Sequence, residues 1–295
     1  MKDFDGKVAV ITGAASGIGR ALALGLGGLG CHLALADLNA NGLEQTAAAT
    51  RRADRKTTIH PLDVSRREAV YAFADEVKRE HGQVDLVINN AGVSTGVEIE
   101  DLDYDYFESL MNINFWGVVY GCKAFLPLLK ERPEAHVVNL SSIFAIASFP
   151  RYAPYNAAKA AVRAFTETLA AEMMIQKRPI GVSCVFPGAV RTNIANTSEQ
   201  HIRSFLEAPG YDISHIPEEK IRAAEARGVL LKAFYESSDI TSPEAAAETI
   251  IEGIRNNRLR ILVGKGAQEM DELVRQHPDQ YLEFLAASGT PFFAP

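Results

Sequence analysis

Short apolar runs alternate with segments of helical composition along most of this chain, and this alternation restricts the possible folds more than any other feature. The runs that we expect to form strands are 7–12, 32–37, 57–62, 84–89, 136–141, 180–186 and 260–263. Continuous apolar strands are buried on both faces, and intervening helices join them in parallel through right-handed crossovers. The sequence therefore predicts an α/β fold, with a Rossmann-like doubly wound parallel sheet of about seven strands and helices on both faces.

The segments between these strands predict helices over 17–29, 41–52, 66–81, 104–129, 154–176 and 243–256. From 193 to 240 the rhythm lapses into a polar stretch with scattered apolar residues, and so long an interruption is usually functional or mobile. No repeat or change of composition divides the chain. We expect one domain over 1–295, with an insertion at about 193–240 and a tail at 264–295 that forms one or two short helices.

Charge and cysteine content narrow the classes of partner. The formal net charge is −7, which disfavours nucleic acid and anionic membranes as partners. The three cysteines are widely spaced and the seven histidines show no metal-ligand spacing, so we expect no metal site and a reducing, cytoplasmic compartment. There is no signal-peptide pattern and no apolar run of about 18 residues. We therefore expect no membrane span and a small-molecule ligand.

Three glycines, Gly13, Gly17 and Gly19, follow the first expected strand and open the first helix. Gly13 permits a tight turn, and Gly17 and Gly19 would let the backbone approach a pyrophosphate at the positive helix N-terminus. Asp37 ends the second strand near the ~20-residue offset at which an acid binds ribose hydroxyls. Its carboxylate would repel a 2′-phosphate, so NAD is favoured over NADP. The alternatives are a glycine turn without a ligand and an aspartate that only caps a turn.

Tyr155 and Lys159 lie four residues apart in an expected helix and therefore share one of its faces. Lowering the pKa of a tyrosine from ~10 to ~7 needs roughly 4 kcal/mol, which a unit charge ~4 Å away supplies at an effective dielectric of ~20. Burial acts in the opposite direction. The tyrosine is thus a plausible general base once the positive nicotinamide of NAD adds to the field of the lysine. Taken alone, such a pair is more often an ordinary helix surface.

The segment Thr12-Gly13-Ala14-Ala15-Ser16-Gly17-Ile18-Gly19 resembles the TGxxxGIG fingerprint of the short-chain dehydrogenase/reductase superfamily. Further segments are similar to marks of that family, namely Asp63-Val64, Asn89-Asn90-Ala91-Gly92, Asn114, Ser142, Tyr155-Asn156-Ala157-Ala158-Lys159 and Pro187-Gly188. The resemblance runs from about residue 7 to 192 and resumes weakly from about 242 to 263. The segment between them and the tail contain no motif of the family.

The resemblance implies a catalytic set of Asn114, Ser142, Tyr155 and Lys159, in which Asn114 holds a water that connects Lys159 to solvent. Ser141 competes for the serine role, but we expect it to face the other side of the strand end. The cofactor contacts that the resemblance and the glycine pattern imply are Gly13, Ser16, Gly17, Ile18, Gly19, Asp37, Leu38, Asp63, Val64, Asn90, Ala91, Gly92, Tyr155, Lys159, Pro187, Gly188, Val190 and Thr192.

These observations lead us to expect an NAD-dependent oxidoreductase that interconverts a secondary, apolar alcohol and its ketone or aldehyde. The alternatives are an NADPH-preferring ketoreductase and a non-catalytic nucleotide-sensing protein. The family resemblance implies a homodimer or homotetramer. We expect the insertion to act as a lid, with apolar residues such as Phe205, Leu206, Ile213, Val229 and Phe234 over the substrate. The polar residues of the insertion, among them His201, Glu207, Glu218, Glu219 and Lys220, would then face solvent.

Overall fold

Seven parallel strands form one sheet, in the order β3-β2-β1-β4-β5-β6-β7. The structure is a computed structural model that describes residues 1–94, 96–207, 218–237 and 239–288. The strands are β1 (Val8–Thr12), β2 (His32–Asp37), β3 (Thr57–Pro61), β4 (Leu86–Asn89), β5 (Ala135–Leu140), β6 (Ile180–Pro187) and β7 (Arg260–Val263). The predicted fold class is confirmed, because the order reverses after β1 as in a doubly wound sheet.

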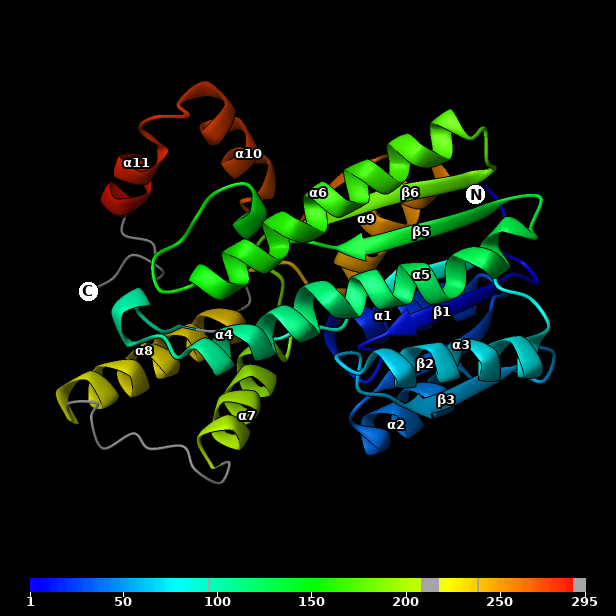
Figure 1. Cartoon of the computed structure of the whole chain (residues 1–295), viewed down its shortest axis with the longest axis horizontal. Coiled ribbons are helices and arrows are strands. Elements are labelled where there is room, and N and C mark those ends of the chain that lie inside the picture. Colours follow the sequence, from blue (N-terminus) through cyan, green and yellow to red (C-terminus); the bar gives the residue numbers. More distant parts are fainter. Residues whose placement is uncertain (95, 208–217, 238, 289–295) are drawn as a thin grey trace.

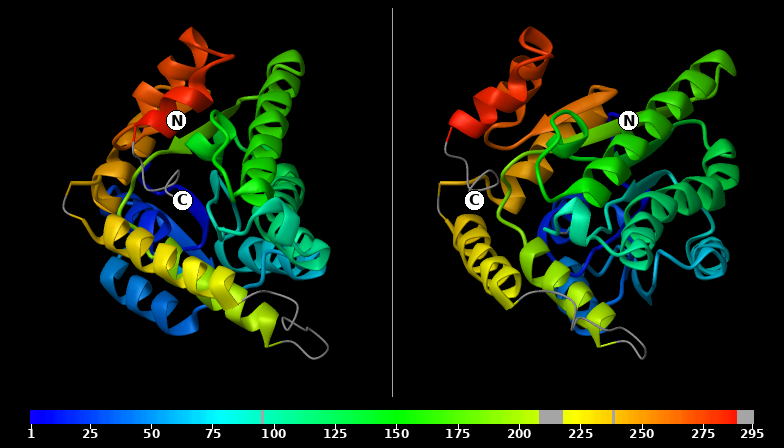
Figure 2. Two further views of the ribbon diagram at one scale, coloured as in Figure 1. Left: turned by 90° about the vertical axis from the view of Figure 1, so that its left-hand side faces the viewer. Right: turned by 60° about the vertical axis from the view of Figure 1, so that its left-hand side comes forward.

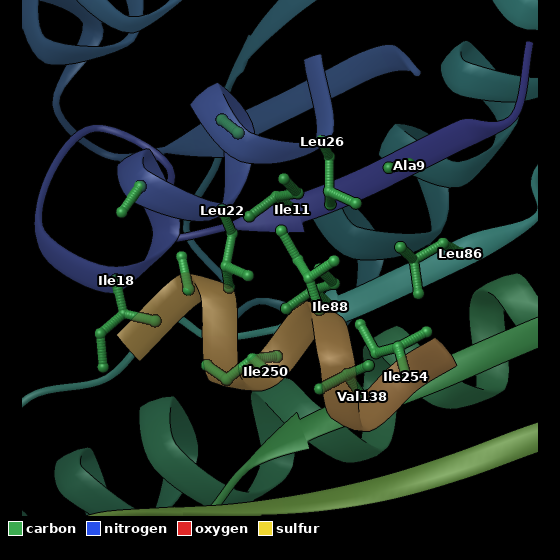
Figure 3. Close-up of a cluster of buried hydrophobic side chains, with 14 of the residues drawn as sticks. Ala9, Ile11, Ile18, Leu22, Leu26, Leu86, Ile88, Val138, Ile250 and Ile254 are labelled. Carbon is green, nitrogen blue, oxygen red and sulfur yellow. The ribbon is translucent and has the colours of Figure 1, made fainter. Parts of the chain in front are cut away.

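Helices cover both faces of the sheet (Figure 1). One face carries α1 (Gly17–Gly28), α2 (Ala40–Thr50) and α9 (Pro243–Arg255), and the other carries α3 (Arg67–His81), α5 (Gly117–Lys130) and α6 (Ala153–Ile175). Figure 3 shows the first of these cores, where Leu22 of α1 and Ile250 of α9 meet Ile11 and Ile88 of the central strands. The neighbouring Val10 points into the other core. Successive residues of each strand are buried on opposite faces of the sheet. The strands are therefore unbroken apolar runs in the sequence.

The remaining helices gather beyond the carboxyl ends of the strands, on the left of Figure 1. They are α4 (Tyr104–Met111), α7 (Ile194–Leu206), α8 (Glu218–Glu236), α10 (Ala267–Gln276) and α11 (Tyr281–Ala287). Figure 2 (left) views the molecule from that side and shows α8 running across the front with α10 and α11 above it. A third apolar cluster lies here, and it includes Phe144, Phe149, Tyr155, Met270 and Leu285. The two short helices predicted for the tail are therefore part of this cluster.

The helix predicted over 104–129 is interrupted. A π-helical turn, η2 (Asn112–Trp116), separates α4 from α5. In such a turn the hydrogen-bonding pattern widens by one residue, as in the bond from the Gly117 amide to the Asn112 carbonyl, and π turns occur most often at functional sites. The apolar pattern continues through the turn, so the periodicity of the sequence does not reveal it.

The insertion at 193–240 contains two helices, α7 and α8, which the sequence pattern did not predict. His201 of α7 was predicted to face solvent, but it is half-buried. Its ring stacks on that of Tyr106 of α4 with the ring centres 5.7 Å apart, and its Nε2 lies 3.1 Å from the Ser109 Oγ. Phe205 meets the same tyrosine edge-on at 5.1 Å. These long-range contacts, which no local pattern encodes, hold α7 against α4.

The expected division of the insertion into apolar and polar sides is only partly correct. Phe205 and Phe234 are half-buried, and Glu207, Glu218 and Glu219 are exposed as predicted. Leu206 and Val229, however, are 37% and 69% exposed, so their place over a substrate stays a prediction. Ile213 and the side chain of Lys220 lie outside the described part of the chain.

Candidate active site

A cavity of about 710 Å³ lies at the carboxyl ends of the strands. Ligands of open α/β sheets bind at this edge, where the strand order reverses. Nearly all the residues that the sequence singled out line it, namely Gly13, Ser16, Gly17, Ile18, Asp37, Leu38, Asp63, Val64, Asn90, Ala91, Gly92, Ser142, Tyr155, Lys159, Pro187, Gly188, Val190 and Thr192. Gly19 and Asn114 lie behind this lining rather than in it.

The turn between β1 and α1 is held in a shape that requires glycine. Gly13 and Gly17 have φ values of +66° and +53°, which side-chain-bearing residues rarely adopt. The Asn90 side-chain amide donates to the carbonyls of Thr12 and Gly13 at 2.9 and 3.1 Å. The turn is thereby fastened to the end of β4, and the N-terminus of α1 faces the cavity.

Gly19 has a different role from the one that the sequence suggested. We expected it to let the backbone approach a pyrophosphate, but it does not line the cavity. A Cβ at this position would overlap the Gly13 carbonyl oxygen and lie 2.5 Å from the Asn90 Nδ2. Glycine is needed here because the first turn of α1 packs directly on the β1–α1 turn.

Asp37 stands at the end of β2 on the edge of the cavity. Its two carboxylate oxygens accept hydrogen bonds from the amides of Ala15, at 3.0 Å, and Asn39, at 2.9 Å. The aspartate therefore stabilises the turn, which is the role given to it in the alternative to ribose binding. An ionised carboxylate can accept about four hydrogen bonds, so this one retains capacity for the hydroxyls of a ligand.

Another wall of the cavity is formed by the end of β6 and the residues that follow it. Gly188 donates its amide to Val263 of β7 at 2.8 Å, and Val190 forms a parallel bridge with Thr241. The Thr192 side chain faces the glycine turn, because a Cβ on Gly17 would lie 3.2 Å from the Cβ of Thr192. The two loops thus approach each other at Gly17 and Thr192, and both line the cavity.

Ser142, Tyr155 and Lys159 meet at the inner end of the cavity, and all three are buried. Ser142 follows β5, and its hydroxyl hydrogen-bonds to the Tyr155 phenol. The Lys159 Nζ lies 5.5 Å from the centre of the Tyr155 ring and donates to the Leu140 carbonyl at 2.9 Å. The structure therefore brings together three of the four residues of the implied catalytic set around one phenol.

Ser141 does not share this position. Its hydroxyl donates to the Lys159 carbonyl at 2.8 Å, and so it joins the end of β5 to α6. Ser142 instead accepts from the Phe144 amide at 3.2 Å and faces the phenol. This geometry favours Ser142 over Ser141 for contact with a substrate oxygen.

Asn114 is fully buried in the π-helical turn, directly behind Lys159. Its side chain donates to the carbonyls of Val93 and Leu110 and accepts from the Val93 amide. A Cβ on Gly92 would lie 2.6 Å from the Asn114 Oδ1 and 3.4 Å from the Lys159 Nζ. Asn114 therefore adjoins the lysine through Gly92, and its side chain is already occupied by backbone partners.

Burial dominates the ionisation of this site. It raises the pKa of Tyr155 to about 12, although the hydrogen bond with Ser142 partly opposes the shift. Burial also lowers the pKa of Lys159 to about 8. The field of the lysine is therefore not sufficient to ionise the phenol at neutral pH, in agreement with the expectation that a further positive charge is required.

The family model described as "short chain dehydrogenase" matches residues 7–203. The chain belongs to the short-chain dehydrogenase family. SadH of Mycobacterium tuberculosis, named as an oxidoreductase, is 39% identical over 293 residues, 99% of each chain. Human epidermal retinol dehydrogenase 2 is 37% identical over 196 residues, 65% of this chain and 63% of that protein.

Solved structures of the family agree with this fold. A short-chain dehydrogenase/reductase of Burkholderia phymatum in complex with NAD has a TM-score of 0.84 and 31% identity, with 95% of this chain and 96% of that one covered. The family supports oxidoreductase chemistry and a nicotinamide cofactor. The positive-φ glycine turn at a helix N-terminus and the carboxylate at the end of β2 fit such a cofactor.

Several residues of this short-chain dehydrogenase line the cavity without any signal in the sequence. They are contributed by the helices that cap the sheet, and they include Gln200, His201, Ser204, Tyr235 and Met270. Phe234, which was expected to lie over the substrate, lines the cavity as well. Phe144 and Phe149 also line the cavity. No helix in the described ranges is long and apolar enough to cross a membrane.

Proposed function

We propose that this chain is an NAD-dependent oxidoreductase that interconverts an apolar secondary alcohol and its ketone, with Tyr155 as general acid and base. The observation that carries the proposal is the convergence of the Tyr155 phenol, the Ser142 hydroxyl and the Lys159 ammonium at the inner end of the cavity. A hydroxyl and a phenol at one point can hold a single substrate oxygen. The family relationship supports the same chemistry.

In the proposed reaction the Ser142 and Tyr155 hydroxyls orient the oxygen of the substrate. Tyr155 removes the proton of an alcohol, or returns it to the product of ketone reduction. The bound nicotinamide supplies the hydride acceptor or donor. Lys159 stabilises the phenolate by its charge, and it is held in place by the Leu140 carbonyl. Burial of all three groups excludes water and strengthens their interactions.

The lining of the cavity supports an apolar substrate. Beside Tyr155 stand the stacked rings of Phe144 and Phe149, whose centres are 4.2 Å apart, together with Ile143 and Met270. Such surfaces favour alkyl or ring carbon over charged groups, at about 25 cal/mol per Å² of apolar area buried. The direct test is the near-ultraviolet absorbance of reduced nicotinamide during incubation with NAD and a panel of secondary alcohols. Absence of turnover across the panel would favour the nucleotide-sensing alternative.

Asp37 leads us to predict a preference for NAD over NADP. Asp37→Asn removes the charge that repels a 2′-phosphate, and its single acceptor oxygen can keep one of the two bonds from the Ala15 and Asn39 amides. We expect the ratio of kcat/KM for NAD to that for NADP to fall about tenfold or more, the equivalent of roughly 1.4 kcal/mol. Asp75→Asn, on an exposed position of α3, serves as the matched control and should leave the ratio unchanged. A parent enzyme that prefers NADP contradicts this prediction and points to the NADPH-preferring alternative.

We also propose that α7 and α8 form a lid over the substrate. Among the described residues, α7 contacts the rest of the molecule through the bond from the Ser94 amide to the Ser198 Oγ at 2.8 Å and through the contact of the His201 Nε2 with the Ser109 Oγ at 3.1 Å. Lids belong to the less stable parts of a fold, and their amide hydrogens exchange more slowly when the site is filled. Hydrogen exchange of α7 should be fast in the free protein and slower with NAD and a substrate analogue. Equally strong protection in both states would identify a fixed element instead.

Assembly and compartment remain predictions. A homodimer or homotetramer would be consistent with the usual oligomeric state of the family and with the alanine-rich helix α6. The expectation of a reducing, cytoplasmic compartment rests on Cys31, Cys122 and Cys184, each of which is buried and free. The chemistry proposed for Tyr155 and Lys159 does not depend on the oligomeric state or on the compartment.

A further inference from the structure

A second phenol enters the cavity opposite the sheet. Tyr235 lies in the last turn of α8 and lines the cavity together with Phe234 and the Tyr155 of the proposed catalytic set. The Phe234 and Tyr235 rings meet edge-on, with their centres 5.5 Å apart. Val229, earlier on the same helix, is 69% exposed, so the last turn is where α8 meets the cavity. The function proposed above assigns no role to this tyrosine.

The chain directly after Tyr235 is fastened to the wall of the cavity. Thr241 donates its amide to the Ala189 carbonyl at 3.2 Å and accepts from the Arg191 amide at 2.8 Å. Its hydroxyl accepts from the Lys265 amide at 2.9 Å. Thr241 therefore links the end of β6 to the segment after β7, and this anchor restricts where the last turn of α8 can lie.

The two phenols have different electrostatic surroundings. Burial raises the pKa of Tyr235 well above its ordinary value, and the nearby phenols of Tyr152 and Tyr155 raise it further. Tyr155 has the Lys159 ammonium and the Ser142 hydroxyl beside it, whereas the groups that shift the pKa of Tyr235 are other phenols. Two titratable groups whose environments differ in this way take different roles. Tyr235 keeps its proton and acts as a hydrogen-bond donor throughout the range in which Tyr155 works.

We propose that Tyr235 donates a hydrogen bond to a second oxygen of the substrate, near the reacting carbon. The reacting oxygen is already held by Ser142 and Tyr155, which reach it from β5 and α6. Tyr235 shares the cavity with the apolar rings of Phe144, Phe149 and Phe234. When a substrate fills the cavity, the Tyr235 hydroxyl needs an acceptor, because an unsatisfied donor costs about 1–3 kcal/mol. The substrate class is thus a secondary alcohol or ketone with an apolar body and an adjacent ether, hydroxyl or carbonyl oxygen. This inference rests on the proposed function.

The test uses two ketones of nearly equal shape, 2-methoxycyclohexanone and 2-ethylcyclohexanone, in which one oxygen replaces one methylene. The parent enzyme should reduce the methoxy compound with a kcat/KM about tenfold or more above that of the ethyl compound, as expected for one hydrogen bond to a buried donor. Tyr235→Phe keeps the ring and removes only the hydroxyl, and should lower the ratio about tenfold, to the value set by the intrinsic reactivity of the two ketones. Tyr104→Phe, at a position that is 85% exposed, is the matched control and should keep the ratio of the parent.

A binding measurement separates specificity from catalysis. Each ketone binds the enzyme–NAD complex without turnover, and calorimetry should show the same preference in the parent and its loss in Tyr235→Phe. Affinity for NADH alone should be unchanged in this variant, which also reports that it is folded. An equal preference in parent and Tyr235→Phe overturns the inference and leaves the proposed function intact. Failure of the parent to reduce any ketone or oxidise any alcohol of the panel overturns both.

Discussion

Replacing Tyr155 with phenylalanine is expected to lower turnover by about 100-fold to 10,000-fold, the usual contribution of a general acid–base group, while leaving the affinity for NAD within a few-fold. The phenol is the group that hydrogen-bonds to Ser142 beside Lys159, and phenylalanine preserves the ring packing against Phe144. Steady-state kinetics and fluorescence titration with NADH measure the two effects separately. Tyr71→Phe, on the exposed side of α3, is the matched control and should retain full activity.

The same assignment predicts how the rate depends on pH. Burial raises the pKa of Tyr155 to about 12, so the protonated form needed for ketone reduction predominates at neutral pH in the free enzyme. The ionised form needed for alcohol oxidation grows as the pH rises. The pKa of Lys159 is lowered to about 8, so its ammonium is present below that pH and is lost above it. The rate of oxidation should therefore rise with pH and level off near pH 8, where the phenolate loses the charge that stabilises it.

Two results would contradict the catalytic assignment. Activity of Tyr155→Phe within a few-fold of the parent would show that another group moves the proton. A rate of oxidation that falls as pH rises through the neutral range would show that the protonated phenol is the active form in that direction. A flat profile would indicate that a step other than proton transfer limits the rate, and single-turnover kinetics would then be used for the comparison.

Replacing Gly19 with alanine is expected to abolish measurable binding of NADH and to lower the free energy of unfolding by about 3 kcal/mol, the upper end of the usual cost of overpacking. The added Cβ would overlap the Gly13 carbonyl oxygen and press against the Asn90 Nδ2. Both atoms belong to the network that fastens the β1–α1 turn to β4, so the backbone cannot yield at one point alone. Denaturant unfolding and fluorescence titration are the measurements.

Gly28 provides the control for this change, because it lies at the other end of the same helix. A Cβ at Gly28 meets no atom within 4 Å, and alanine is the better helix former by about 1 kcal/mol. Gly28→Ala should therefore be neutral or slightly stabilising, with unchanged NADH binding. If Gly19→Ala behaves like Gly28→Ala, the close contact between α1 and the turn is not the reason for glycine at position 19.

Several features of the fold could be predicted from local sequence because they depend on neighbouring residues. The strand at His32–Asp37 was predicted with its observed bounds, since an unbroken apolar run is the direct consequence of burial on both faces. The pairing of Tyr155 with Lys159 follows from helix geometry, which places residues four apart on one face. The glycine turn was recognisable because a positive φ requires glycine at Gly13 and Gly17.

The sequence by itself determined the doubly wound sheet and the identity of the residues that meet around Tyr155. The tertiary structure alone decided what depends on contacts between distant segments. Gly19 is needed because of the Gly13 carbonyl and the Asn90 amide, and His201 is half-buried with its ring stacked on Tyr106. Tyr235 lines the cavity together with residues of β6 and α6 that are far from it in the sequence. Periodicity records which face of an element is buried, but it carries no information about the partner that buries it.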